Sequence, residues 1–118
     1  MTPDESVRRR SGSSVRLLVV YTTRLEECHA FYSSLGLTFV PEKHGRGPRH
    51  YAAVLSDGCV MELYPATSPE RATGRMRLGL ALDAPPSSAL RPNDDGTYTD
   101  PDGRTVDVVN WGNNPEDG

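Results

Sequence analysis

The sequence predicts an α+β fold with two related halves, each ending in a strand that carries one acidic residue. Asp57-Gly58 leads into an alternating strand that contains Glu62, and the turn at residues 100–103 leads into a second such strand that contains Asp107. Residues 24–35 have the apolar spacing of an amphipathic helix, and the second half has no stretch like it. We therefore expect a complete first module and a truncated second one.

The composition is that of one folded domain and argues against two classes of partner. With 118 residues, 36% of them hydrophobic, the chain is long enough for a single core. A net charge of −3 argues against nucleic acid as the main partner. The longest aliphatic run, residues 17–20, is too short for a membrane span or a secretion signal. Cys28 and Cys59 lack metal-type spacing, so we expect reduced thiols in a cytoplasmic protein.

The boundaries of the domain follow from the distribution of polar residues. Residues 1–14 are polar and Ser-rich, which predicts a disordered leader. We expect the domain at residues 15–111, with modules at about 15–66 and about 74–111, and a flexible tail at 112–118.

The first half begins with the pattern of a strand followed by a helix. Residues 15–21 form an apolar run typical of a buried strand. Thr23 and Glu26 have the spacing of a capping box, which predicts a helix at about residues 24–35. Gly36 stands where a glycine commonly ends a helix.

Three further strands are predicted in the first half. Residues 37–40 begin the next strand, and Pro41 ends its regular pairing. Residues 50–56 and 59–64 predict a hairpin joined by Asp57-Gly58, a strong signal for a tight turn. The first half is therefore expected to be a βαβββ unit.

The second half repeats this pattern incompletely. Residues 75–82 predict a strand, but Pro85 and Pro86 leave room for at most about one helical turn after it. Residues 98–99 predict a brief strand, and residues 104–111 predict the last one.

Three motifs resemble those of the vicinal oxygen chelate superfamily, which includes glyoxalase I, bleomycin-resistance proteins and extradiol dioxygenases. They are FYSSLGL at residues 31–37, VMELY at 60–64 and DPDGRTVD at 100–107, and together they place the resemblance over residues 15–111. The resemblance implies paired βαβββ modules that form a curled mixed sheet around a cup, here made shallower by the truncated second module. It also implies a homodimer with grooves between the subunits.

The resemblance implies four positions at which enzymes of this superfamily hold a divalent metal. In this sequence they are Leu17, Glu62, Arg77 and Asp107. Leu17 has no donor atom, and the guanidinium of Arg77 stays protonated and has no acceptor. A unit charge about 5 Å from a dication costs roughly 6 kcal/mol at an effective dielectric near ~20. We therefore expect no cofactor, with a divalent metal on Glu62 and Asp107 as the alternative.

Strand alternation predicts which side chains line the cup. At its centre we expect Arg77 to neutralise both Glu62 and Asp107. Aromatic and aliphatic side chains around a few polar groups are typical of a small-molecule pocket, and equally of a filled core. The predicted ligand-binding residues are Leu17, Val19, Tyr21, His50, Val60, Glu62, Tyr64, Arg77, Gly79, Asp107 and Trp111.

Two histidines outside this set are expected to contribute little. His29 occupies a polar position on the helix and is expected to be solvated. His44 belongs to a basic loop, residues 41–49, for which two interpretations stay open: solvated surface, or a gate that draws an anionic ligand to the cup.

Three functions fit these observations. The first, which we favour, is a metal-free protein of the glyoxalase/bleomycin-resistance type that binds or sequesters a small organic molecule. The second is an enzyme, a metal-dependent or general-base lyase, isomerase or dioxygenase, with Glu62 and Asp107 as the catalytic candidates. The third is a non-catalytic assembly domain, in which the charged residues are a buried ion-pair remnant. Nothing in the sequence indicates the ligand.

Overall fold

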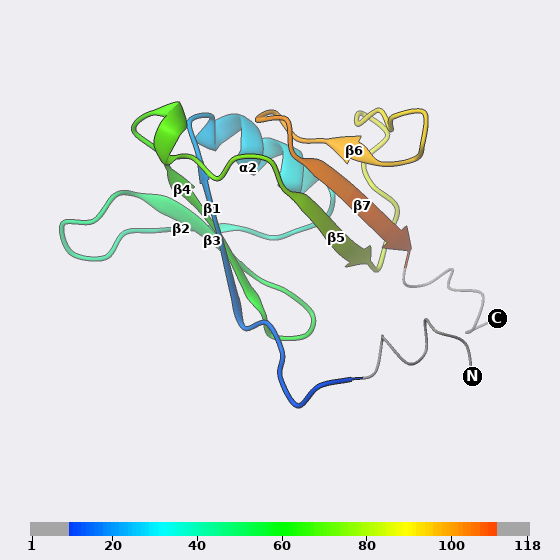
Figure 1. The fold of residues 1–118 in the computed structure, drawn as a ribbon, viewed down its shortest axis with the longest axis horizontal. Coiled ribbons are helices and arrows are strands. Elements are labelled where there is room, and N and C mark those ends of the chain that lie inside the picture. The colour runs from blue at the N-terminus through cyan, green and yellow to red at the C-terminus, as the bar shows by residue number, and fades with distance from the viewer. Residues whose placement is uncertain (1–9, 111–118) are drawn as a thin grey trace.

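Two mixed sheets and one α-helix make up residues 10–110, the part of the chain that the computed structural model describes (Figure 1). The first sheet has the strand order β1-β4-β3-β2, and the second has the order β5-β7-β6. The elements are β1 (Leu17–Thr22), α2 (Leu25–Ser34), β2 (Val40–Glu42), β3 (His50–Val54), β4 (Val60–Pro65), the 3-10 turn η1 (Pro69–Arg71), β5 (Arg77–Leu82), β6 (Tyr98–Thr99) and β7 (Thr105–Asn110).

The strand register confirms that the two halves are related. β1 runs parallel to β4, and β5 runs parallel to β7. Glu62 lies opposite the residue two positions after Leu17, and Asp107 lies opposite the residue two positions after Arg77. The two pairs thus occupy equivalent places. Within residues 10–110 the second half has three strands and no α-helix, so the predicted truncation is confirmed.

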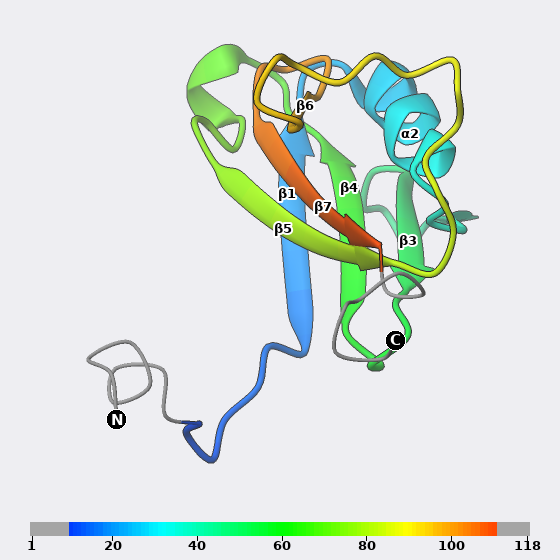
Figure 2. The same ribbon diagram turned by 90° about the vertical axis from the view of Figure 1, so that its right-hand side faces the viewer.

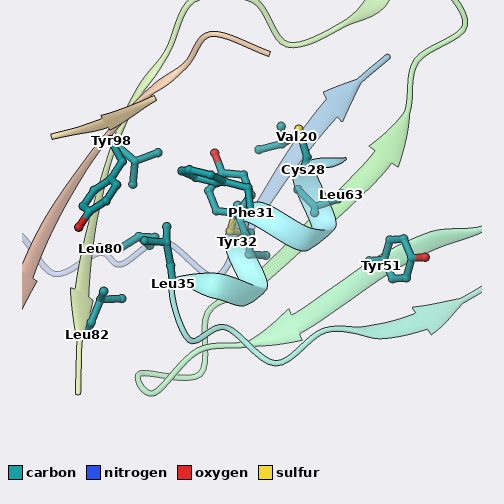
Figure 3. Packing of buried hydrophobic residues seen from close by; sticks show 12 residues of the cluster. Val20, Cys28, Phe31, Tyr32, Leu35, Tyr51, Leu63, Leu80, Leu82 and Tyr98 are labelled. Atoms are coloured by element: carbon teal, nitrogen blue, oxygen red, sulfur yellow. The ribbon is translucent and has the colours of Figure 1, made fainter. Parts of the chain in front are cut away.

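Helix α2 packs against the inner faces of both sheets and so contributes to one shared core. Phe31 and Tyr32 of α2 and Leu35, the residue that follows it, lie between the sheets, as Figure 3 shows. In place of a second helix, the exposed segment 83–97 runs across the end of α2 (Figure 2), and the Ser87 N–H donates to the carbonyl of Ser34 at 2.9 Å. The other buried partners come from both sheets: Val20, Met61 and Leu63 from the first, and Leu80, Leu82, Tyr98 and Val106 from the second.

The side chain of Arg104, which is 1% exposed, joins the two sheets. Its Nη2 donates to the carbonyl of Tyr21 on β1 and to that of Thr73 in the connecting segment, both at 2.9 Å. Its Nη1 donates to Asp100 Oδ2 at 2.9 Å, and its Nη2 also reaches Asp102 Oδ2 at 2.9 Å. Burial disfavours the charged guanidinium, but hydrogen bonding to the negatively charged Asp100 prevails and raises the pKa of Arg104.

The turn that carries these carboxylates is held by the first half of the chain. The Tyr32 hydroxyl donates to Asp100 Oδ2 at 2.7 Å, and the Thr22 hydroxyl donates to Asp102 Oδ2 at 2.6 Å. Among the described residues, no buried side-chain nitrogen or oxygen lacks a hydrogen-bond partner. A buried ion pair is tolerated only when its remaining polar atoms are satisfied in this way.

The start of α2 differs from the prediction. The expected capping box is wrong, because Arg24 holds the N-cap position and no side chain caps the helix there. The carboxylate of Glu26 instead accepts a hydrogen bond from the Tyr51 hydroxyl at 2.7 Å. The hydrogen bond from Tyr51 therefore engages the carboxylate that a capping box would place at the start of the helix. The end of the helix is as predicted, with Gly36 at a φ of 108°.

Three strand starts also differ from the prediction, while the hairpin is confirmed. β1 begins at Leu17 rather than at residue 15, and it is only partly buried because it is an edge strand. β2 begins at Val40 rather than at residue 37, and it includes Pro41, which lies opposite Tyr51. A proline fits there because β2 is an edge strand with no neighbour that needs its N–H. β5 begins at Arg77, two residues later than expected. In the hairpin turn, Gly58 adopts a φ of 88°.

Replacing Arg104 is expected to destabilise the fold severely. Arg104→Met leaves the buried carboxylate of Asp100 without its cation, which costs about 3–5 kcal/mol in comparable sites. Urea unfolding followed by circular dichroism measures the loss. Arg77→Met is the matched control, because Arg77 is exposed and its removal should leave the unfolding midpoint nearly unchanged. Equal midpoints for the two variants would contradict the role given to Arg104.

The pKa of Tyr32 predicts a loss of stability at alkaline pH. Burial, followed by hydrogen bonding to Asp100, raises this pKa far above its ordinary value. An unfolded tyrosine ionises near pH 10, whereas folded Tyr32 stays neutral. Its contribution is therefore complete below about pH 10 and is lost as the pH rises further. Unfolding of the wild type and of Tyr32→Phe is compared between about pH 8 and about pH 11; the wild type should lose more stability, and parallel curves would refute this assignment.

Candidate functional site

The functional candidates lie on the open faces of the two sheets, by which we mean the faces turned away from the common core. On the first sheet, the register aligns Leu17, Val19 and Tyr21 of β1 with Val60, Glu62 and Tyr64 of β4. On the second, it aligns Arg77 and Gly79 of β5 with Thr105 and Asp107 of β7. The alternate residues of the same strands, among them Val20 and Leu80, are buried.

Apolar side chains are left uncovered on these open faces. Among the described residues, the large hydrophobic side chains that remain exposed are Val15, Leu17, Tyr21, Val40, Val54 and Val109. Val15 precedes β1, and the register places the other five on the open faces. On the first sheet, Leu17 and Val54 flank Val60 in one row across β1, β4 and β3, and apolar surface gathered on one face can mark a place where a ligand or a partner binds.

Arg77 and Asp107 form a two-point ion pair on the second sheet. Arg77 Nε donates to Asp107 Oδ2 at 2.5 Å, and Nη2 donates to Oδ1 at 2.9 Å, so both carboxylate oxygens are engaged. This hydrogen bonding raises the pKa of Arg77 and lowers that of Asp107. The side chains are 68% and 36% exposed, so the pair is a surface feature rather than a buried remnant.

On the first sheet, an aromatic row crosses three strands. Tyr21 lies beside Tyr64 with ring centroids 5.8 Å apart, and Tyr64 stacks on His50 at 4.0 Å. His50 is 1% exposed, and its Nε2 lies 3.6 Å from Glu62 Oε2. Glu62 is thus placed beside an imidazole, with its side chain 17% exposed.

The expectation that Arg77 neutralises both acids is therefore corrected. Arg77 pairs with Asp107, whereas Glu62 lies on the other sheet, next to His50. The physical reason is that both sheets pack their inner faces on one core, so their open faces do not face each other within one chain. The predicted residues are brought together as two separate groups, and Trp111 lies outside the described residues.

Two hollows adjoin the open faces. The larger, with a volume of about 850 Å³, lies between the end of α2, the β3–β4 turn and β5, and includes Leu37, Val54 and Gly79 in its lining. A Cβ on Gly79 would meet nothing within 4 Å, so this glycine borders free space. The smaller, of about 300 Å³, lies beside Tyr21 and Arg71. Glu62 and Asp107 line neither hollow.

The residues at the four superfamily positions do not fit a metal. Leu17 offers no ligand atom, and Arg77 offers only donors, which already occupy both oxygens of Asp107. Of the four, only Glu62 keeps a carboxylate without a neighbouring cationic guanidinium. A catalytic metal commonly needs about three protein ligands, so these positions cannot supply the superfamily's metal centre.

Glu42 was missed by the sequence analysis, and His44 was considered only as part of the basic loop. Glu42 and His44 lie next to His50, with Glu42 Oε1 3.3 Å from Nε2 of each histidine. The expectation that Pro41 ended the strand hid this contact, because it removed Glu42 from the pairing with His50. His29 is also less solvated than expected, since its ring stacks on that of Tyr51 at 3.9 Å.

Comparison with known proteins confirms the fold. No family model and no curated protein matches the sequence. Among solved structures, the integron cassette protein VCH_CASS1 of V. cholerae aligns with a TM-score of 0.59 at 15% identity, over 87% of this chain and 98% of that one. Oxidase ChaP-H2 aligns with a TM-score of 0.55 at 12% identity, over 85% and 94%. Lactoylglutathione lyase from Agrobacterium tumefaciens aligns with a TM-score of 0.50 at 17% identity, over 87% and 97%.

At these identities the likeness establishes the fold alone. The chain has a vicinal oxygen chelate-like fold, as the resemblance of its motifs implied, and it spans almost the whole length of each of these structures. Within residues 10–110, none of the helices has the length and apolar character needed to cross a membrane.

The ion pair on the second sheet predicts a shifted titration. Because Arg77 donates two hydrogen bonds to the charged form of Asp107, the carboxyl should titrate below its ordinary pKa, and Arg77→Met should return the pKa toward that value. Carbon-13 NMR of the side-chain carboxyl measures both. An unchanged titration in the variant would mean that the pair does not persist in solution.

Proposed function

We propose that the chain forms a homodimer that binds a small organic molecule between the first sheet of one copy and the second sheet of its partner. The observation that carries this proposal is the placement of the exposed apolar side chains, Leu17 and Tyr21 on one open face and Val109 on the other. Covering them with a second copy removes apolar surface from water. An isologous dimer uses each face once and closes.

Such a dimer would assemble the predicted cup from two chains. The Arg77–Asp107 pair of one copy would face the aromatic row and Glu62 of its partner. The cup would then combine apolar walls with a few polar groups that orient a ligand, as small-molecule sites commonly do. Arg77 suits the recognition of a carboxylate or another planar anionic group, because its guanidinium presents several donors in one plane.

Binding in this cup needs no metal at the four superfamily positions. The residues there supply a hydrophobic contact, a fixed cation and two carboxylates, which can hold a polar ligand by hydrogen bonding and charge. This favours binding or sequestration over the metal-dependent reactions of the superfamily, whose ligands are replaced at Leu17 and Arg77.

The proposal predicts that a charge on the open face disrupts both assembly and binding. Leu17 is 55% exposed, so Leu17→Glu should leave the fold intact. It should weaken dimer formation at least about tenfold, which corresponds to about 1.4 kcal/mol. Sedimentation equilibrium measures the dimer constant, and thermal shift against a panel of small aromatic and carboxylated compounds measures ligand binding.

A matched control places the same charge on the opposite side of the molecule. Ala30 is exposed on α2, and Ala30→Glu should leave both the dimer and the ligand-induced shift unchanged. A second variant, Gly79→Leu, fills the free space beside β5 and should reduce ligand binding without lowering stability. A chain that stays monomeric and is stabilised by none of the compounds would refute the proposal.

A further inference from the structure

Three ionisable side chains converge at the outer edge of the first sheet, apart from the four superfamily positions. We call them the edge cluster: Glu42, His44 and His50. One ligand atom from each lies within 4.8 Å of the others. Glu42 Oε1 is 3.3 Å from His44 Nε2 and 3.3 Å from His50 Nε2. Imidazole and carboxylate are the ligand types that suit divalent transition metals such as Zn²⁺.

The backbone builds this cluster from two strands and the loop between them. The antiparallel register of β2 and β3 sets Glu42 opposite His50. Gly45, at a φ of 57°, turns the loop, and the Gly47 N–H donates to the carbonyl of His44 at 2.9 Å. A Cβ on Gly47 would lie 3.1 Å from that carbonyl oxygen, so glycine permits the close approach. This turn brings the side chain of His44 next to those of Glu42 and His50.

The orientation of His50 leaves one nitrogen available as a ligand. Its Nδ1 lies 3.1 Å from the carbonyl of Pro48, an acceptor that requires the proton on Nδ1. Stacking on Tyr64 holds the ring, and the side chain is 1% exposed. A backbone carbonyl that fixes the tautomer while the other nitrogen faces the site is the usual arrangement of a metal-bound histidine.

The surroundings of that nitrogen call for a cation. His50 Nε2 points at two carboxylates, since it lies 3.3 Å from Glu42 Oε1 and 3.6 Å from Glu62 Oε2. A proton on Nε2 would satisfy these contacts by hydrogen bonding, and a divalent ion that replaces the proton would satisfy them by coordination.

Two of the three ligand-atom distances in the edge cluster match a tetrahedral centre, and the third lies within 4.8 Å. Metal–ligand bonds of about 2.0–2.1 Å imply ligand atoms about 3.3–3.4 Å apart, close to the two contacts of Glu42. We propose that the edge cluster binds one divalent transition metal ion of the Zn²⁺ type, with a fourth position open beside Glu62. The site uses none of the four superfamily ligand positions, and it goes beyond the proposed function because it needs neither the dimer nor the organic ligand.

Metal titration of the full chain tests the proposal. Chelator-treated protein is titrated with Zn²⁺ by calorimetry and with Co²⁺ by visible absorption. We expect one ion per chain and the intense Co²⁺ bands of a four-coordinate site. His44→Ala and Glu42→Gln should each lower the affinity by roughly 100-fold or more, since loss even of an outer-shell partner costs 10–100-fold.

Three variants serve as controls. His29→Gln removes an imidazole that stacks on Tyr51 outside the cluster, and it should leave the affinity unchanged. Asp107→Asn alters a superfamily position and should also leave it unchanged. Leu17→Glu should bind the ion as the wild type does, which separates a failure of this proposal from a failure of the proposed dimer.

The decisive variant must keep the stability of the wild type, so that a loss of metal binding is not caused by unfolding. The side chain of His44 is 72% exposed, so His44→Ala should keep the unfolding midpoint of the metal-free wild type. The proposal is overturned by the absence of one-to-one binding, by an affinity that His44→Ala and Glu42→Gln leave unchanged, or by an affinity that Asp107→Asn removes. Any of these outcomes leaves the small-molecule proposal to its own test.

Discussion

The buried guanidinium of Arg104 is the interaction on which the arrangement of the two sheets depends. β1 and β5 are edge strands of separate sheets, so no complete ladder of backbone hydrogen bonds joins the halves. Arg104 bridges them through the carbonyls of Tyr21 and Thr73 and through two carboxylates of its own turn. A planar group with five donors suits this task, because it satisfies several acceptors at once in a site closed to water.

The same packing decides where chemistry can occur. Because one helix fills the space between the sheets, both inner faces are committed to the core and only the open faces are available. The charged residues are consequently divided, with His50 and Glu62 on one sheet and the Arg77–Asp107 pair on the other. In the homodimer that we propose, a second copy would bring the two groups together. The edge cluster does not depend on a second copy, because β2, β3 and the loop between them supply all three of its residues within one chain.

Local patterns predicted the elements well, and contacts between distant residues account for what they missed. The hairpin at Asp57-Gly58, the helix and the truncated second half follow from turn chemistry, apolar spacing and proline positions. The capping box failed because Tyr51 binds the carboxylate that the pattern assigned to the helix start. The alternation of inward and outward residues along the strands does not show which arginine is buried. Arg104 is the buried cation, and Arg77 is exposed. The turn before Arg104 held the signal, because its two aspartates supply acceptors for a buried guanidinium.

The segment 83–97 has a consequence for how this fold varies in length. It stands where the resemblance of the motifs implied a second helix, yet it pairs with no strand and is mostly exposed. It meets the end of α2 through the Ser87–Ser34 backbone contact. Lengthening a surface connection costs little free energy, because the entropy of closing a loop grows only slowly with its length. Evolution could thus add or delete residues here without disturbing the parallel pairing of β5 with β7, and an engineer could insert a reporter peptide at the same point.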